Sequence, residues 1–263
     1  MNASLQLTSI HLRVPDLARS LRFYVDQLGF VLRTRSDTGA ALATGADAPE
    51  ILQLVADPAA PAAPRDAAGL FHAALLFPSR PALGAWLRIA AERGVEFDGF
   101  SDHGVSEALY FSDPDGNGLE FYVDRPRAAW PFVNGQLAMG TEPLDIQSLL
   151  AAGRDAGGTA PLAGAGWGHL HLRVMDLDRS ENFYRTILGL ATTQASYPGA
   201  RFLAADGYHH HLGLNIWGHP RRPQPPGAPG LAEATFASAH VAGPRELRDP
   251  DGIALRVTPL SSS

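Results

Sequence analysis

Residues 11–30 of this 263-residue chain read HLRVPDLARSLRFYVDQLGF, and residues 171–190 read HLRVMDLDRSENFYRTILGL. The two segments are identical at 12 of 20 positions, which predicts that two parts of the chain are built alike. In the first copy, Asp16 is placed to cap a helix whose apolar residues recur at helical spacing, and Gly29 ends that helix. A strand precedes the helix in each copy. The repeat therefore predicts the same strand–helix unit in both halves.

Between the two copies lies another unit with the same order of elements, which is the second of the chain. An apolar strand over Leu70–Phe77 precedes a helix over Pro81–Arg93, which has proline near its start and Gly94 beyond its end. Further strands are expected near Val95–Phe97, Ala108–Ser112 and Leu119–Val123. The unit is therefore one strand, one helix and three strands, or βαβββ.

A fourth unit is present in shortened form. A strand is expected around Ala234–Val241, and a turn with the sequence Asp-Pro-Asp-Gly at Asp249–Gly252 leads into a last strand, with no helix between them. The expected division of the chain is two βαβββ modules in residues 1–123, a linker with a short helix near Asp145–Ala151 in residues 124–166, and the third and truncated fourth modules in residues 167–263.

The composition excludes several classes of protein. The chain has no cysteine, so any metal must be held by nitrogen and oxygen ligands. A net charge of −6 without a cluster of lysine or arginine argues against nucleic-acid binding. The N-terminal residues lack the pattern of a signal peptide, and no apolar run approaches the ~18 residues of a membrane span. We therefore expect a cytoplasmic protein that contacts neither nucleic acid nor membrane.

The segment His103–Glu120, HGVSEALYFSDPDGNGLE, offers an imidazole, a phenol and a carboxylate around another Asp-Pro-Asp-Gly turn. Val105–Ser112 and Gly118–Val123 are typical of two strands with that turn between them. A hairpin of this kind can bring all three side chains to one pocket. They are the residue types that metal-assisted oxygen chemistry needs.

This segment resembles the ring-cleavage motif of the type I extradiol dioxygenases, which belong to the vicinal oxygen chelate superfamily with the glyoxalases and bleomycin resistance proteins. The positions that match the motif are His103, Leu109, Tyr110, Asp113, Pro114, Gly116 and Glu120. One position departs from it, because Ser101 stands where the motif favours glycine, asparagine, threonine or an aliphatic residue. The paired βαβββ modules are similar to the α+β fold of that superfamily, here with a degenerate fourth module. The resemblance covers nearly the whole chain and implies an Fe(II)-dependent dioxygenase that cleaves a catechol-type ring with O2.

The resemblance also implies a set of metal ligands. In the superfamily, each module offers one metal-facing position on its first strand and one on its last. These positions are His72 and Glu120 in the second module and His169 in the third. In the first and fourth modules they are Ser9 and Arg256, which are poor ligands. The implied site is therefore a 2-His-1-carboxylate set between the second and third modules, suited to Fe(II), with Mn(II) as an alternative.

Two further histidines leave this ligand set open. His11 and His171 each lie two residues after a first-strand position and so face the same side of their strands. His171 is an alternative to His169, and His11 an additional candidate. Packing or hydrogen bonding is the expected role of both, because they recur in the repeat even where no metal is expected.

Three adjacent histidines, His209, His210 and His211, precede an apolar strand. Extradiol dioxygenases carry a His-His pair at an equivalent strand, and the resemblance assigns that pair to His209 and His210. It implies that His210 transfers protons, and that Tyr110 and His103 hydrogen-bond or orient substrate oxygens. Alternation along a strand would place His209 and His211 on one face and His210 on the other. The assignment of the pair among the three histidines therefore stays open by one residue.

Two other functions remain alternatives. A glyoxalase-type isomerase or lyase usually has four protein ligands with two carboxylates, whereas only one glutamate is placed here. A non-catalytic binder of the bleomycin-resistance type would keep the fold without the metal, and the near-complete ligand set counts against it. The expected partners are a small aromatic diol and O2. The shortened fourth module leaves a sheet edge of the outer modules less covered, which predicts a homodimer.

Overall fold

The computed structural model describes residues 4–64, 66–154 and 161–260. The first module contains β1 (Leu5–Val14), α1 (Leu17–Leu21) continued by the π-helical turn η1 (Arg22–Gln27), β2 (Val31–Ser36), β3 (Gly39–Ala43) and β4 (Glu50–Ala56). The second contains β5 (Gly69–Leu76), α2 (Arg80–Glu92), β6 (Gly99–Asp102), β7 (Ser106–Ser112) and β8 (Gly118–Asp124). The third contains β12 (Gly166–Arg173), α4 (Leu177–Leu188), β13 (Ala191–Gln194), β14 (Ala200–Ala204) and β15 (Leu212–Asn215). The fourth contains β16 (Gly230–Ser238), β17 (Arg245–Arg248) and β18 (Ala254–Pro259).

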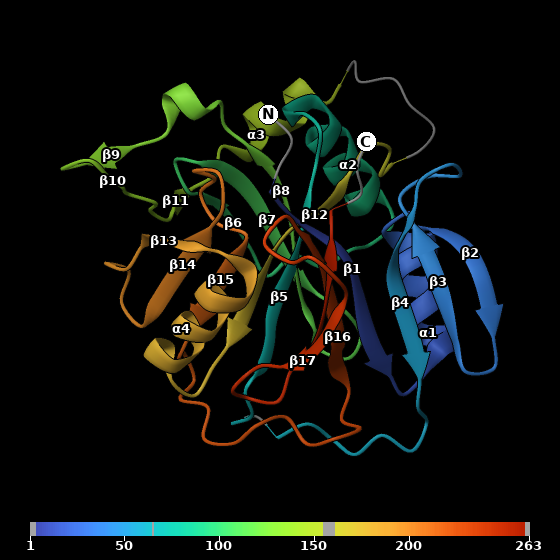
Figure 1. Ribbon diagram of the computed structural model, residues 1–263. Coiled ribbons are helices and arrows are strands. Elements are labelled where there is room, and N and C mark those ends of the chain that lie inside the picture. The colour runs from blue at the N-terminus through green and yellow to red at the C-terminus, as the bar shows by residue number, and fades with distance from the viewer. Residues whose placement is uncertain (1–3, 65, 155–160, 261–263) are drawn as a thin grey trace.

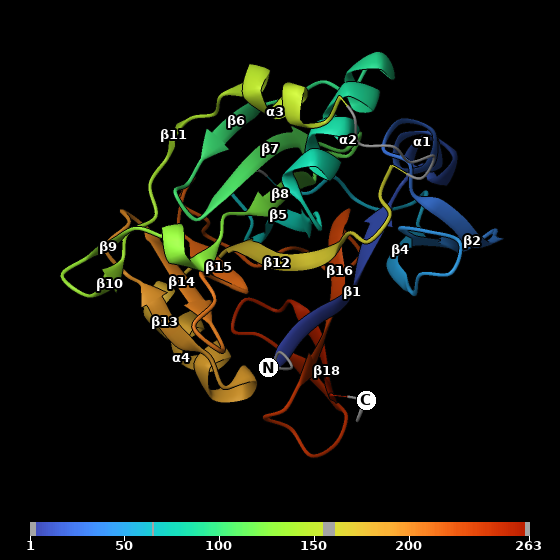
Figure 2. The ribbon, with the colours of Figure 1, turned by 90° about the horizontal axis from the view of Figure 1, so that it is seen from above.

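The four modules form two curled sheets (Figures 1 and 2). The outer sheet joins the first and fourth modules in the order β17-β18-β16-β1-β4-β3-β2. The inner sheet joins the second and third modules, and its central strands have the order β7-β8-β5-β12-β15-β14. In each sheet the first strands of the two modules are antiparallel neighbours, β1 with β16 and β5 with β12.

The linker between the second and third modules has structure of its own. It contains the 3-10 turn η2 (Arg127–Ala129), the hairpin of β9 (Phe132–Val133) and β10 (Gln136–Leu137), then β11 (Glu142–Pro143) and α3 (Ile146–Ala152). The carboxylate of Asp145 accepts a hydrogen bond from the Ser148 amide and caps α3, where the short helix was expected. β11 joins the inner sheet beside β6, so the linker returns to the second module (Figure 2).

Two expected strands are corrected by the structure. No strand forms at Val95–Phe97, and β6 begins only at Gly99. The amide of Val95 instead donates to the carbonyl of Ala90 and closes the end of α2, while the Phe97 ring packs 6.2 Å from Trp86. The strand expected around residues 234–241 lies earlier, as β16, and in the described residues no helix lies between β16 and β18.

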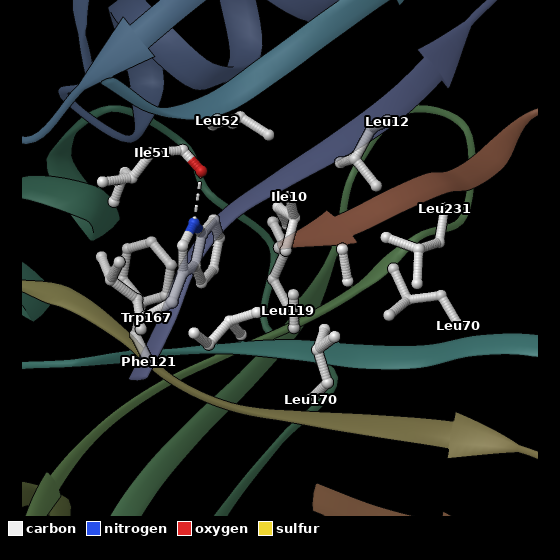
Figure 3. Close-up of a cluster of buried hydrophobic side chains, with 14 of the residues drawn as sticks. Ile10, Leu12, Ile51, Leu52, Leu70, Leu119, Phe121, Trp167, Leu170 and Leu231 are labelled. Atoms are coloured by element: carbon white, nitrogen blue, oxygen red, sulfur yellow. Dashed lines mark hydrogen bonds between the residues drawn. The ribbon is translucent and has the colours of Figure 1, made fainter. Parts of the chain in front are cut away.

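The core lies where the two sheets pack together, along the crossing of β1 and β12 (Figure 3). Trp167 of β12 reaches across and donates from Nε1 to the carbonyl oxygen of Ile51 on β4 at 2.6 Å. Trp86 of α2 is buried and donates to the carbonyl of Leu28 in the first module. Both indoles thus bury apolar rings without leaving an N–H unpaired. None of the described helices is both long and apolar enough to cross a membrane.

Candidate metal centre

Three side chains meet at the middle of the inner sheet, from the adjacent strands β8, β5 and β12. Oε2 of Glu120 lies 2.9 Å from Nε2 of His72 and 3.1 Å from Nε2 of His169. One potential ligand atom from each side chain lies within 4.8 Å of the others. Within the described part of the chain, this is the only such group of three or more histidine or acidic side chains.

The pleat of the sheet explains why these side chains converge. Ala74 of β5 is the cross-strand partner of Glu120 on one side and of His169 on the other. His72 lies two residues before Ala74 and so points to the same face. Ala74 itself contributes only a methyl group to this face.

The electrostatics of the three residues suit a metal. Burial alone would raise the pKa of the Glu120 carboxyl, but the adjacent His169 and His72 hold that pKa well below its usual range. Burial lowers the pKa of His169 to about 4, against the opposing effect of Glu120. Near neutral pH the site therefore presents a carboxylate and a neutral imidazole, the forms that bind metal ions.

His72 and Glu120 of this group line a cavity of about 300 Å³. Its lining is mostly aromatic and apolar and contains no lysine or arginine. Apart from the triad, the ring-bearing and apolar side chains of the lining are Phe71, His103, Val105, Tyr110, Met139, His171, Tyr197, Phe202, His210 and Trp217. A cavity of this size and chemistry suits a small aromatic molecule.

His103 and Tyr110 are joined at one side of this cavity. Nδ1 of His103 lies 2.6 Å from the carbonyl oxygen of Gly140, and Nε2 lies 2.7 Å from the Tyr110 hydroxyl. Since the carbonyl only accepts, Nδ1 carries the proton and Nε2 accepts from the phenol when the ring is neutral. Burial, with the nearby Glu120 carboxylate, raises the pKa of Tyr110 well above its usual value, so the phenol stays protonated.

The three adjacent histidines differ from the expected arrangement. They lie in the turn between β14 and β15, so strand alternation does not apply, and the expectation that His209 and His211 share a face is wrong. The rings of His209 and His210 both lie near His169, with centroids 6.3 and 4.0 Å away. His210 lines the cavity, whereas Nδ1 of His211 accepts from the Ala205 amide, away from the site.

The structure separates the two additional candidate histidines. The His171 ring faces the cavity with its centroid 4.9 Å from that of His72, so it lies beside the triad. His11 lies on β1 in the outer sheet, where Glu233 is its cross-strand partner. There Arg256 pairs with Glu233 at 3.2 Å, so an ion pair stands in the outer sheet where the inner sheet has its triad.

Several residues of the site carried no signal in the sequence. The linker residues Met139, Gly140 and Thr141 form one wall of the cavity, although the linker reads as a connection. The buried side chain of Gln194 holds this wall, because it accepts from the Met139 amide at 3.1 Å and donates to the Met139 carbonyl at 3.2 Å. Asp124, whose Oδ1 lies 2.8 Å from Nε2 of His209, is different, because its place four residues after Glu120 on the same strand could have been noticed in the sequence.

Comparison with known proteins gives consistent results. Residues 6–121 and 166–242 match the family described as the Glyoxalase/Bleomycin resistance protein/Dioxygenase superfamily. The chain is 41% identical over 249 residues to catechol-2,3-dioxygenase of Bacillus subtilis (strain 168), covering 89% of this chain and 86% of that protein. It is 33% identical over 96 residues to biphenyl-2,3-diol 1,2-dioxygenase 2 of Rhodococcus globerulus, covering 33% of this chain and 50% of that protein.

Solved structures share the fold. A crystal structure of a Bacillus subtilis protein superposes with a TM-score of 0.63 at 13% identity, covering 98% of this chain and 86% of that one. Glyoxalase I from Zea mays superposes with a TM-score of 0.58 at 18% identity, covering 97% and 92%. With the family match spanning most of the chain, these findings show that the protein belongs to the Glyoxalase/Bleomycin resistance protein/Dioxygenase superfamily.

Proposed function

We propose that this protein is an extradiol dioxygenase that opens a catechol-type ring beside its two hydroxyl groups with O2, using Fe(II) held by His72, Glu120 and His169. The observation that carries the proposal is the meeting of these three buried side chains beside a mostly apolar cavity, which His72 and Glu120 line. The identity of 41% to a catechol-2,3-dioxygenase over 89% of the chain supports this activity. The expected substrate is therefore a small aromatic diol.

The donor set fits a divalent iron. Two imidazoles and one carboxylate leave further positions of a six-coordinate ion open. Nε2 of His72 is buried and makes no hydrogen bond, although it lies 2.9 Å from Glu120, and buried polar atoms rarely lack a partner unless they serve another role. When bound, the metal would supply the activation of dioxygen that ring cleavage needs. Mn(II) accepts the same donors, and metal analysis distinguishes the two ions.

The remaining residues of the cavity have separable roles. Burial, together with the neighbouring imidazoles of His169 and His209, lowers the pKa of His210 well below its usual range, so His210 is a neutral base before substrate enters. It can take a proton from a diol hydroxyl and later return one. The phenol of Tyr110 donates its proton to Nε2 of His103, which orients it, and its oxygen can accept a hydrogen bond from a substrate hydroxyl. The apolar walls exclude water from the reacting ring.

The alternatives are less well supported. A glyoxalase-type metal site would need a second carboxylate, and in the described residues the only acidic member of the group is Glu120. The structural likeness to glyoxalase I, at 18% identity, concerns the fold alone. A non-catalytic binder would have no use for three buried, converging ligand residues.

We infer that two copies of the chain associate through the outer sheet. Its edge strands are β17 and β2, and the fourth module supplies no helix in the described residues to cover it. Unpaired strand edges favour association with another chain. Light scattering on the purified protein is expected to give twice the mass of one chain, and a monomer at high concentration contradicts the inference.

The activity is tested on the full chain loaded anaerobically with Fe(II). Adding catechol and air is expected to produce the yellow ring-opened product in proportion to the iron bound. Parallel samples loaded with Mn(II) and Zn(II) test the metal, because Zn(II) has no redox chemistry to offer. An iron-loaded protein that binds catechol without consuming O2 would overturn the proposed activity.

A further inference from the structure

We propose that Asp124 and His209 are positioning residues that hold His210 in the tautomer whose Nε2 is unprotonated and free to act in the cavity. This inference rests on the proposed function, in which His210 transfers the protons. It assigns roles to a carboxylate outside the ligand set and to an imidazole that is fully buried but does not line the cavity.

The alternation of β8 brings Asp124 to this position. Glu120 and Asp124 are four residues apart on β8, so their side chains leave the same face of the sheet. Glu120 meets the histidines of the triad, whereas Asp124 lies beyond them, beside the turn that carries His209. Oδ1 of Asp124 lies 2.8 Å from Nε2 of His209 and accepts a second hydrogen bond from the Tyr208 hydroxyl at 3.1 Å.

The histidine pair continues this chain of hydrogen bonds. Nδ1 of His209 lies 2.7 Å from Nδ1 of His210. His209 has no exposed surface, so no water replaces either of its ring partners. The three groups therefore form a continuous line from Asp124 to the wall of the cavity.

Hydrogen-bond chemistry fixes where the protons lie. A carboxylate only accepts, so Nε2 of His209 carries a proton and donates to Asp124. The Nδ1 atom of a neutral His209 is then bare and accepts from Nδ1–H of His210. A neutral His210 with its proton on Nδ1 has a bare Nε2, the atom left to take a proton from substrate. The same logic orients the histidine of the Ser-His-Asp triad, here extended through a second imidazole.

Of the three hydrogen-bonded groups, Asp124 is the one that solvent reaches. Its side chain is 28% exposed, and it lines a separate cavity with Val123 and Trp167. Truncating Asp124 therefore removes a partner of His209 without opening the substrate cavity, in whose lining it has no part.

A double-mutant cycle on the iron-loaded enzyme tests the proposal. Asp124→Ala is expected to lower kcat for catechol by ~10- to 100-fold, with KM, the anaerobic Kd for catechol and the iron content within about twofold of wild type. In a His210→Phe background the same change is expected to alter kcat less than about twofold, because Asp124 acts through His210. Asp37→Ala, in the exposed turn after β2, controls for the loss of one acidic charge.

A purely structural role predicts a different result. Equal losses of kcat in both backgrounds, lost iron or an unchanged kcat in Asp124→Ala would each overturn the proposal. Asp124→Asn keeps the shape and, with its Oδ1 toward His209, is expected to recover part of the lost kcat.

Histidine nitrogen spectra of the ¹⁵N-labelled, Zn(II)-loaded protein give a readout without turnover. Wild type is expected to show His209 protonated at Nε2 and His210 at Nδ1, with both assignments lost in Asp124→Ala. If wild type does not turn over catechol, the proposed function fails, and these spectra still decide the hydrogen-bond chain. Unchanged tautomers in Asp124→Ala would contradict it.

Discussion

Glu120 carries the negative charge among the buried imidazoles of the cavity, and its side chain is almost wholly removed from solvent. His72 and His169 both contact the same carboxylate oxygen. An ionised carboxylate at such a depth is stabilised only by charge or hydrogen bonds directed at it. Metal binding at this site and the ionised state of Glu120 therefore depend on each other.

Replacing Glu120 with glutamine keeps the shape of the ligand and removes its charge. We expect the iron content after anaerobic loading to fall by more than about tenfold, with activity lost in proportion. Glu246→Gln on β17, whose side chain is 72% exposed, is the control and should retain its iron. His72→Ala and His169→Ala should behave as Glu120→Gln does. Full metal and activity in all three variants would exclude this ligand set.

Replacing His210 with phenylalanine separates proton transfer from metal binding. The ring of His210 packs against His169 and Phe202, and phenylalanine fills similar space. We expect iron to stay bound while kcat falls by ~10²-fold or more, because the proton acceptor is gone. Single-turnover rates under air check this. A wild-type rate would exclude His210 as the proton acceptor, and loss of iron would contradict the separation of its role from metal binding.

Among the helices and strands, the residues that recur in the repeat share a structural role, which the sequence alone does not show. The tyrosine shared by both copies holds the Asp-Pro-Asp-Gly turn of the following module. The Tyr24 hydroxyl donates to Asp113 at 2.8 Å, and the Tyr184 hydroxyl donates to Asp249 at 2.9 Å. The shared arginine of each helix contacts a second aspartate of the same turn. The identical positions therefore fasten one module to the next.

Tyr184→Phe tests this fastening away from the metal centre. It removes one donor from the buried Asp249 while leaving the ring in place, and is expected to lower the free energy of unfolding by about 1.5–3 kcal/mol. Tyr24→Phe should cost a similar amount at Asp113. Urea unfolding of metal-free protein measures both. Losses below about 0.5 kcal/mol in each variant would show that the contacts do not stabilise the fold.

On the scale of the whole molecule, the candidate metal site joins two modules. His72 and Glu120 come from the second module and His169 from the third, on strands that pair across the middle of the inner sheet. A metal that binds only the folded chain stabilises it by about 2.7 kcal/mol at a hundredfold excess over Kd. We expect Fe(II) to raise the unfolding temperature by roughly 2–4 °C for each kcal/mol gained. Glu120→Gln should abolish this shift, and an equal shift in that variant would place the metal elsewhere.

The fold family and the type of chemistry can be predicted from the amino-acid sequence. The family match confirms the resemblance drawn from the hairpin motif, and the α+β fold is confirmed with it. These features are local in sequence. A helix cap at Asp176, a turn at Asp249 and the period of a strand depend on near neighbours, so a repeat of 12 identical positions could reveal them.

Other features of the site depend on residues that are distant in the sequence and become visible only in the folded chain. His210 enters the cavity because a turn rather than a pleat orients it, and no periodicity predicts a turn's side-chain directions. The wall at Gly140 comes from a linker that returns to the second module, and its contact with His103 joins residues 37 apart. Asp124 gained a partner only when His209, 85 residues away, was folded against it. Such contacts depend on how the modules pack, which side-chain alternation within one strand does not specify.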